Sequence, residues 1–298
     1  MIRIRPEKEE RTMPGNYSQY IERMTNSFTR TTKSLIPYYA IQLTAGHPRP
    51  RILDVGFGSG VVGSALRSLL PDAVICGIDM APQNIQNAPQ GIYDELYGCR
   101  LEDFYLPHQQ DAFDLVIFSS VLHEISSYAE EDRFSTGHIK NALRKTRDLL
   151  KDGGYVLIRD GLKSPREDLV SVELMSEKDL DALKRFCLQR PMNPWEEEER
   201  KYQLALIQAA DDLHLSFPNN VFREFLCTWT WGPESWNREV QERFCTMTLA
   251  EWVQALEGAG FECAVNIASL EEYPKFFARI CRYQLEDPVI GVLAGEKR

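Results

Sequence analysis

The sequence lacks the apolar stretches of a membrane protein and the cysteine pattern of a disulfide scaffold. No run reaches the ~18 apolar residues that a transmembrane helix needs, and residues 1–8 contain no apolar signal core. The seven cysteines are scattered, odd in number and without a Cys-x-x-Cys pair, which is typical of reduced thiols. We therefore expect a cytoplasmic protein with no membrane partner.

An excess of positive charge is also missing. The 34 Lys and Arg residues stand against 44 Asp and Glu residues, which gives a formal net charge of −10 at pH 7. This balance disfavours a tight, non-specific grip on a phosphate backbone, and therefore nucleic acid as a partner. The 298 residues are enough for one large domain or for a core with an insertion, without help from disulfides.

The most informative segment joins an apolar run to a glycine-rich turn. Residues 52–55 read as a parallel strand covered on both faces, and Gly56, Gly58 and Gly60 follow at alternate positions. Glycine accepts positive φ and lets the main chain approach a ligand closely. From residue 61 to 70 the apolar spacing becomes helical. Strand, glycine turn and helix together predict the opening unit of a nucleotide-binding α/β domain.

Further polar groups follow the ends of the next apolar runs. The run 73–78 ends in Asp79, about 20 residues beyond the glycine turn, where a carboxylate meets ribose hydroxyls. Glu102 and Asp103 form an acidic pair that can accept from an adenine amino group. The run that starts at residue 113 ends in Ser119. Because ligands of open α/β sheets gather where the strands end, these groups are candidates for one site.

In order and spacing, these segments resemble the class I S-adenosylmethionine-dependent methyltransferases. The resemblance covers residues 50 to 160 well and the C-terminal fifty residues loosely. It implies an α/β fold with a Rossmann-like seven-stranded sheet, and S-adenosyl-L-methionine as the cofactor with S-adenosyl-L-homocysteine as its product. The segments that carry it are Asp54–Gly60, Gly77–Met80, Leu101–Asp103, Asp114–Val116 and Lys151–Ile158.

The resemblance also implies which residues bind the cofactor. Asp54 orders the loop near the amino-acid end of the cofactor, and an N-terminal lid of one or two helices brings Tyr17 or Tyr20 to its carboxylate. Packing of these tyrosines on the core is the alternative. The residues placed at the cofactor are Asp54, Gly56, Gly58, Gly60, Asp79, Met80, Glu102, Asp103, Ser119 and Tyr17.

A dinucleotide-binding dehydrogenase is the competing interpretation of the glycine turn. Residues 58–63 satisfy the Gly-x-Gly-x-x-Gly fingerprint, and Asp79 would serve a ribose in either case. In a pyrophosphate site, however, the strand runs straight into the first fingerprint glycine, whereas Gly56 and Phe57 intervene here. The pattern around the turn therefore favours the methyltransferase.

The candidate catalytic residues follow the apolar run that starts at residue 113, which is the fourth expected strand. His123 leaves the sheet beside the expected sulfonium and titrates in a range that suits proton transfer, and Glu124 could orient it. The alternative is that His123 only packs beside the cofactor. Position 127 is serine, so the His-Glu-x-x-His spacing of a zinc site fails and we expect no metal. Ser119 and Ser120 replace the Asn/Asp-Pro-Pro-aromatic turn of methyltransferases that modify planar amino groups, which disfavours such acceptors.

The chain divides into four parts in this prediction: a helical lid at 1–45, the core at 46–160, an inserted helical cap at 161–247, and a C-terminal helix and β-hairpin at 248–298. Helices are expected near 61–70, 83–96, 137–150, 178–190 and 196–213, and a final strand at 276–283. Four of the five tryptophans lie between residues 195 and 236. They form either the cap's own core or a substrate pocket.

The functional hypothesis is methyl transfer to an oxygen, nitrogen, sulfur or carbon atom of a small molecule, such as a natural product or a peptide. One alternative is methylation of tRNA or protein, and another is a non-catalytic, cofactor-binding regulator. Substrate contacts are also conceivable at a few charged or phenolic residues, for which ordinary ion pairing is the simpler interpretation: Arg159, Asp160, Tyr202, Arg223 and Glu224.

Overall fold

The computed structural model describes residues 3–4, 22, 32–105, 112–193, 196–269, 277–283 and 286–298. Its larger part is a mixed sheet with the strand order β1-β4-β3-β2-β5-β6-β11-β9. Strands β1 to β6 run parallel to their neighbours, and β11 pairs antiparallel with both β6 and β9. The bounds are β1 Arg3–Ile4, β2 Arg51–Val55, β3 Val74–Asp79, β4 Glu95–Gly98, β5 Phe113–Ser119, β6 Leu150–Gly161, β9 Phe261–Ser269 and β11 Ile290–Lys297.

This sheet confirms the predicted Rossmann-like α/β fold. Seven of its strands form the expected sheet, and the two-residue β1 is added beside β4. Side chains alternate between two apolar layers: Ile52 belongs to one buried cluster and Leu53 to the other. Helices α2 and α3 cover one face of the sheet, while α6 and α11 cover the other. Their bounds are α2 Leu35–Leu43, α3 Val61–Leu69, α6 Thr136–Leu149 and α11 Leu249–Gly258.

Local sequence explains where these helices begin. The Ser135 side chain accepts a hydrogen bond from the Gly137 amide at the start of α6. Thr248 and Glu251 form a reciprocal capping box at the start of α11. Each such cap stabilises its helix by about 0.5–2 kcal/mol.

One expected helix is much shorter than predicted. The prediction at 83–96 was wrong in extent, because α4 covers only Pro82–Gln86 and β4 already starts at Glu95. Pro89 cannot continue a helix, and Gly91 has a φ of 73°. These two residues stop the helical periodicity before the next strand.

Only part of the predicted lid at 1–45 lies within the described residues. Helix α2 packs beside α3 on the sheet, with Ile36 and Ala40 fully buried. A short 3-10 helix, η2 (Thr32–Ser34), leads into it. Tyr17 and Tyr20 lie outside the described residues, so their cofactor role stays a prediction.

The cap is a second layered unit rather than a purely helical one. A three-stranded antiparallel sheet with the order β10-β7-β8 packs against the cap helices around its own apolar core. The helical description of the cap is corrected accordingly. The elements are β7 Leu169–Leu174, α7 Glu177–Gln189, α8 Glu197–Gln208, β8 His214–Pro218, α9 Asn219–Trp229, α10 Trp236–Glu239 and β10 Cys281–Tyr283.

The prediction of a final core strand at 276–283 was wrong. Residues 281–283 form β10 of the cap sheet, where Arg282 lies opposite Glu173 and donates to it at 3.0 Å. The strand that completes the core sheet is β11, whose residues 290–295 are all buried. A strand paired on both sides and covered on both faces needs such an apolar run, and an exposed arginine fits an edge strand instead.

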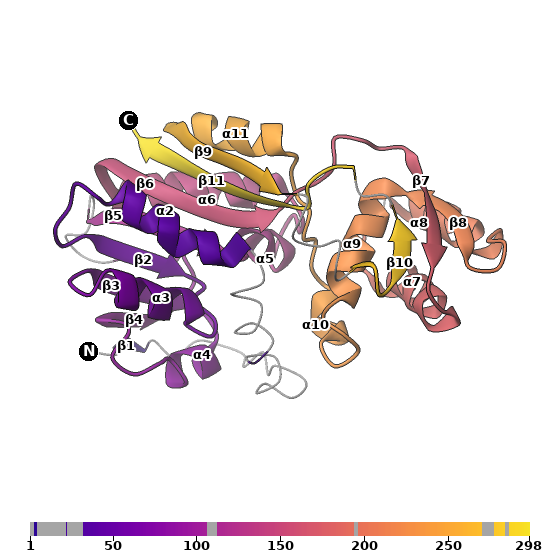
Figure 1. The fold of residues 1–298 in the computed structure, drawn as a ribbon, viewed down its shortest axis with the longest axis horizontal. Helices are drawn as coiled ribbons and strands as arrows, with labels where there is room; N and C mark the ends of the chain where they lie inside the picture. Colours follow the sequence, from indigo (N-terminus) through magenta and orange to yellow (C-terminus); the bar gives the residue numbers. More distant parts are fainter. Residues whose placement is uncertain are drawn as a thin grey trace.

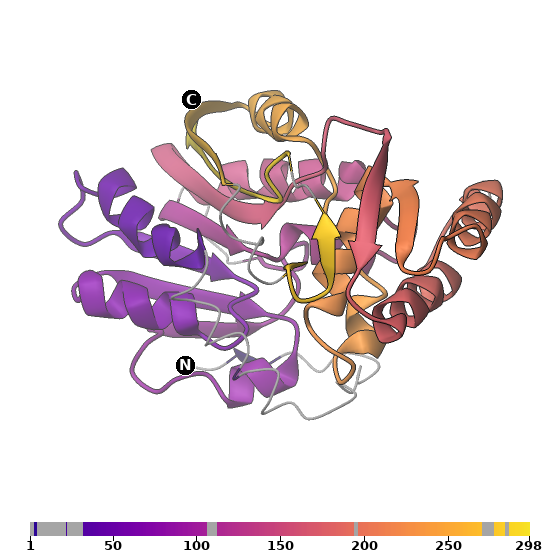
Figure 2. The same cartoon turned by 45° about the vertical axis from the view of Figure 1, so that its right-hand side comes forward.

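The cap lies beyond the edge of the core sheet at which the parallel strands end (Figures 1 and 2). Two neighbouring residues of α9 hold the segments that connect the two parts. Arg223 is fully buried and donates to the carbonyl groups of Leu162 at 3.1 Å and Asp287 at 3.0 Å. Glu224 accepts from the amides of Phe244 and Cys245 at 2.8 and 2.7 Å. These contacts fix the position of the cap relative to the core.

Among the helices of the described residues, none combines the length and the apolar character that crossing a bilayer requires.

Candidate active site

The glycine turn between β2 and α3 has the conformation that its sequence predicts. Gly56, Gly58 and Gly60 all have positive φ, at 63°, 54° and 71°. A Cβ atom on Gly56 would lie 2.5 Å from a methyl group of Val121, and one on Gly60 would lie 2.6 Å from the Pro89 ring. Side chains are therefore excluded here by both backbone conformation and space. The turn is a main-chain cradle.

Asp79 ends β3 beside this turn. Its Oδ2 accepts from the Gly58 amide and from the Asn84 side chain, each at 3.0 Å, and its Oδ1 accepts from the Ala81 amide at 2.8 Å. Burial raises the pKa of Asp79, while the hydrogen bonds oppose that rise. A carboxylate has about four acceptor positions, so Oδ1 can still accept from a hydroxyl group. The turn and Asp79 together fit the ribose end of a nucleoside.

Asp54 lies inside β2 and has a partner that the sequence did not indicate. It accepts a hydrogen bond of 2.9 Å from the Tyr93 hydroxyl. Burial raises the pKa of Asp54 to about 7, although this hydrogen bond opposes the rise. The Tyr93 ring also packs on Phe57, with 4.9 Å between the ring centroids. Tyr93 thus packs against the glycine turn and its preceding strand, and no local sequence motif indicates this role.

The remaining predicted cofactor residues lie around the same edge. Met80 is 49% exposed directly after Asp79. Glu102 and Asp103 are exposed in a turn that follows β4. Ser119 ends β5, and its buried Oγ has no hydrogen-bond partner within the described part of the chain. All four keep their cofactor role as a prediction.

His123 lies at the start of α5 (Leu122–Ser127) and is held by Asp160 from the end of β6. Its Nδ1 is 2.6 Å from Asp160 Oδ1, and its backbone amide donates to Asp160 Oδ2 at 3.1 Å. Asp160 also accepts from the Gly161 amide at 2.8 Å. The carboxylate therefore fixes both the ring and the main chain of His123. In the sequence, the signal for Asp160 was its position at the end of the strand that is β6 in the structure.

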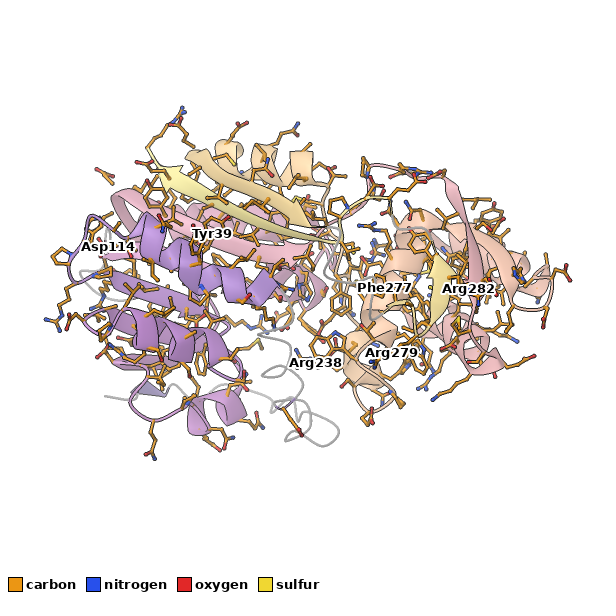
Figure 3. The ribbon with its side chains drawn as sticks, in the orientation of Figure 1. Tyr39, Asp114, Arg238, Phe277, Arg279 and Arg282 are labelled. Carbon is orange, nitrogen blue, oxygen red and sulfur yellow. The ribbon has the colours of Figure 1, made fainter. Side chains whose placement is uncertain are left out.

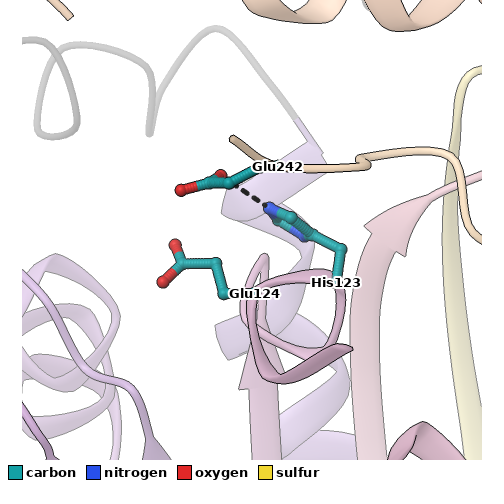
Figure 4. Close-up of side chains that lie close together, drawn as sticks. All are labelled: His123, Glu124 and Glu242. Carbon is teal, nitrogen blue, oxygen red and sulfur yellow. Dashed lines mark ion pairs between the residues drawn. The ribbon is translucent and has the colours of Figure 1, made fainter. Parts of the chain in front are cut away.

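The other side of the His123 ring faces the cap. Glu242, just after α10, places its Oε2 3.5 Å from His123 Nε2, as Figure 4 shows. The hydroxyl group of Tyr128 donates to Glu242 Oε1 at 2.8 Å. The ring of Phe244 lies 5.0 Å from the imidazole, between centroids. His123 is therefore enclosed between two carboxylates, one from the core and one from the cap.

Arg238 of α10 connects the same residues. Its guanidinium donates to Glu124 Oε1 at 3.0 Å and to Glu242 Oε1 at 3.3 Å. It lies at the boundary between the core and the cap (Figure 3). Its charge also acts on Asp79, where it lowers the pKa. We call the residues that meet here the seam: His123, Glu124, Tyr128, Asp160, Arg238, Glu239 and Glu242.

The charges of the seam shift the pKa values of its members in different directions. Burial by itself would lower the pKa of His123, but the adjacent Asp160 and Glu242 raise it well above its usual value. Burial would raise the pKa of Glu242, but the hydrogen bond with His123 and the charge of Arg238 lower it. The carboxyl groups on the two sides of His123 therefore stabilise the imidazolium form of its ring.

The expectation of no metal rested only on the missing His-Glu-x-x-His spacing. The seam brings together a different set of possible metal ligands. One ligand atom from each of His123, Glu124 and Glu242 lies within 4.8 Å of the others. Arg238, however, already places a guanidinium against both glutamates. Because that cation supplies the positive charge, we assign no metal to the seam.

Arg159, next to Asp160, is buried rather than exposed. Its Nε donates to Thr32 Oγ1 at 2.8 Å, and its guanidinium also donates to Ser120 Oγ. Ser120 has a φ of 62°, an uncommon conformation for a residue with a side chain. Arg159 thus joins the segment before α2 to the bend that follows β5.

The cap aromatics fill the cap's own core. Trp236 is buried and donates to Gln189 at 2.7 Å, and Trp229 donates to Asp179 at 2.9 Å. Their rings meet edge to face at 5.7 Å. Of the two interpretations of these tryptophans, the structure supports packing for this pair. Trp195 lies outside the described residues.

Comparisons with known proteins show the family of the chain. The methyltransferase domain family matches residues 20–265. The Protein-methionine methyltransferase laeA of Emericella nidulans is 26% identical over 225 residues, which cover 65% of this chain and 57% of that protein. The Secondary metabolism regulator laeA of Aspergillus fumigatus is 23% identical over 216 residues, 60% of this chain and 54% of that protein. The chain thus spans about half the length of these relatives.

Two solved structures are also similar. Human N-acetylserotonin methyltransferase in complex with S-adenosylmethionine is 15% identical with a TM-score of 0.48, over 94% of this chain and 55% of that one. A putative S-adenosylmethionine-dependent methyltransferase from Listeria monocytogenes is 15% identical with a TM-score of 0.47, over 89% and 99%. Since the family match spans most of the sequence, the chain belongs to the class I S-adenosylmethionine-dependent methyltransferases.

Proposed function

We propose that this chain transfers the methyl group of S-adenosylmethionine to a nucleophilic atom of a small molecule or a peptide. The observation that carries this proposal is that one sheet edge bears both the glycine cradle with Asp79 and the buried seam around His123. The bound cofactor supplies an electrophilic methyl group. The cap closes the acceptor side with Arg238 and Glu242.

The residues of the chain act mainly by holding the reactants in place. Asp79 and the glycine turn hold the nucleoside, and the seam limits the access of water to the reacting end. Alignment of two reactants can supply about 7 to 11 kcal/mol of a reaction barrier. Methyl transfer needs little else, and a base is required only where the acceptor must lose a proton.

His123 can serve this reaction in two ways. With Nδ1 bound to Asp160, Nε2 is the nitrogen on the cap side, and it could take a proton from a hydroxyl acceptor only after the ring has lost its own proton there. Alternatively, it stays charged and only shapes the site, with Glu124 and Glu242 beside it. The first role predicts that turnover follows the protonation of an imidazole, and the second predicts that it does not.

A protein side chain is the second candidate acceptor. Its support is the name of the relative from Emericella nidulans, a protein-methionine methyltransferase. The net charge of −10 does not favour the tRNA alternative. Some of the relatives are named regulators of secondary metabolism. A non-catalytic, cofactor-binding role is therefore a further candidate for this chain. We also propose a cytoplasmic location, because all seven cysteines are free.

The deciding experiment incubates the purified protein with methyl-labelled cofactor and cell extract, and identifies labelled products by mass spectrometry. We expect a labelled small molecule or peptide that is absent when the Gly58→Val variant replaces the wild type. Label on the chain itself or on another protein would favour the second candidate. Tight cofactor binding without any labelled product would favour the regulator.

A further inference from the structure

The seam contains more acidic than basic groups. Its carboxyl groups are Asp160, Glu242, Glu124 and Glu239, and its cations are His123 and Arg238. Asp160 and Glu242 lie on either side of His123, and Glu242 also accepts from Tyr128 and Arg238. Arg238 is shared with Glu124, so these four carboxyl groups outnumber the two cations.

Glu239 is the most unusual of these carboxyl groups. It is 2% exposed, and its Oε1 accepts no hydrogen bond from any residue that the structure describes. Arg238 Nε lies 3.9 Å away, which is beyond hydrogen-bond distance. A buried polar atom without a hydrogen bond costs about 1–3 kcal/mol, and none of the described residues donates one to this oxygen. Within the described part of the chain, this oxygen stays open to a bound group.

His123 cannot readily take a proton in this arrangement. Asp160 lies against Nδ1 and Glu242 against Nε2, so both ring nitrogens face carboxylates. An imidazole in that position is stabilised as the imidazolium, in which both nitrogens carry protons and neither has a free lone pair. An acceptor that needs its proton removed therefore finds no free base at His123.

We propose that the seam selects acceptors that become cationic on methylation, an amine nitrogen or a thioether sulfur, and that Glu239 and Glu124 hold the positive charge. This inference rests on the proposed function. The lone pair of the acceptor forms the new bond to the methyl carbon, and the electron pair of the broken carbon–sulfur bond stays on sulfur. The positive charge thus passes from sulfur to the acceptor atom, and no proton has to leave. Two carboxylates beside both atoms stabilise this charge before and after the transfer.

The protonation of the two carboxyl groups is consistent with this role. Burial raises the pKa of Glu239 well above its usual value, and the charge of Glu242 adds to this while Arg238 and His123 oppose it. Burial raises the pKa of Glu124 to about 7, again with Glu242 and Asp79 adding and Arg238 and His123 opposing. A cation that enters lowers both pKa values, so its binding releases protons.

The first test compares the sulfonium with its neutral product by titration calorimetry. Wild-type protein, Glu239→Gln and Glu124→Gln each receive S-adenosylmethionine or S-adenosylhomocysteine at pH 7 in two buffers of different ionisation enthalpy. We expect the wild type to prefer the sulfonium and to release protons as it binds. Glu239→Gln keeps the shape of the side chain, so it should lower that preference roughly tenfold and leave the homocysteine affinity unchanged. Glu257→Gln on the exposed side of α11 is the matched control.

The outcomes separate this inference from the proposed function. If neither nucleoside binds to folded protein, the proposed function fails. If both bind and the preference is the same in wild type, Glu239→Gln and Glu124→Gln, only the inference fails. Thermal unfolding of each variant confirms that it is folded.

The second test addresses the acceptor with a stand-in for the methylated product. The S-adenosylhomocysteine complex is titrated with tetramethylammonium chloride, with tert-butanol as the neutral counterpart and sodium chloride as the salt control. We expect the ammonium ion to raise the unfolding temperature of the wild type more than either control, and Glu239→Gln to remove the difference. An equal response to the ammonium ion and tert-butanol, or no response to the ammonium ion, would overturn the proposal.

Discussion

The two halves of the site are built in opposite ways. The proposed cofactor half consists of a glycine turn and one carboxylate, and consecutive residues of the turn supply most of it. The seam uses charged side chains from α5, β6 and α10, brought together across the boundary between core and cap. The first half depends on the absence of side chains, and the second depends on the balance of buried charges. Mutations should therefore damage them by different mechanisms.

The largest expected effect is in the cofactor half. Gly58→Val places a β-branched side chain at a φ of 54°, a left-handed conformation that β-branched residues rarely adopt. We expect cofactor binding to be lost, while the secondary structure by circular dichroism is retained. Gly46→Val is the matched control, because nothing lies within 4 Å of a Cβ atom there. Wild-type affinity in folded Gly58→Val would refute the role of the turn.

Removal of the central cation of the seam should have the next largest effect. His123→Ala leaves Asp160 and Glu242 buried without their shared partner, which should lower the free energy of unfolding by about 3 kcal/mol. Turnover should fall more than cofactor affinity. Chemical denaturation, calorimetry and the labelled-product assay measure the three quantities. The exposed His214 supplies the control His214→Ala; unchanged stability and turnover in His123→Ala would leave the seam without a role.

Asp79→Ala tests the one carboxylate side chain of the proposed cofactor half. It removes an acceptor for the Gly58 and Ala81 amides and for the ribose, so cofactor binding should weaken by about 1 to 3 kcal/mol. Calorimetry measures the change, with the exposed Asp72→Ala at the start of the same segment as the control. An unchanged affinity would count against the ribose role.

Per pH unit, the smallest expected effect is the one that separates the two halves of the site by pH. The pKa of Asp54 is raised to about 7 from 3.8, so between these values the folded state binds more protons than the unfolded state. Stability therefore falls as pH rises through this window, by about 1.4 kcal/mol per pH unit at most. Glu242 has a lowered pKa and contributes in the opposite direction, because its stabilisation is lost as pH falls.

Denaturation of the wild type and Asp54→Asn from pH 4 to 8 tests this prediction. The difference in free energy of unfolding between the two proteins should change across the window and become flat above it. Tyr93→Phe removes the hydrogen bond that opposes the rise, so it should move the upper end of the window to higher pH. Parallel curves for the wild type and Asp54→Asn would contradict the assignment.

Sequence reasoning reached the cofactor half because its information is local. An apolar strand, alternating glycines and a carboxylate at the end of the next strand follow each other within residues 52–79, so spacing alone places them at one edge of the sheet. His123 and Glu124 were found for the same reason, as the residues that follow a buried strand. The parallel order β3-β2-β5 brings the ends of these strands to one edge of the sheet, while the roles of the residues there stay predictions.

The residues that sequence reasoning missed all act across large separations. Tyr93 meets Asp54 from 39 positions away, and Arg238 meets Glu124 from 114 positions away. The same limit explains β10 and β11: a short apolar strand carries no mark of the sheet that it will join. Which charge pairs with which is settled only when the cap packs on the core.

The sequence by itself determined the parallel part of the sheet, the glycine cradle and the kind of ligand that fits it, because each follows from backbone conformation and periodicity over a few residues. Only the tertiary structure decided that His123 lies between Asp160 and Glu242, that β11 completes the core sheet, and that no described residue donates a hydrogen bond to Oε1 of Glu239. Burial and the nearest opposite charge set the protonation of these groups, and both depend on residues that are distant in the chain.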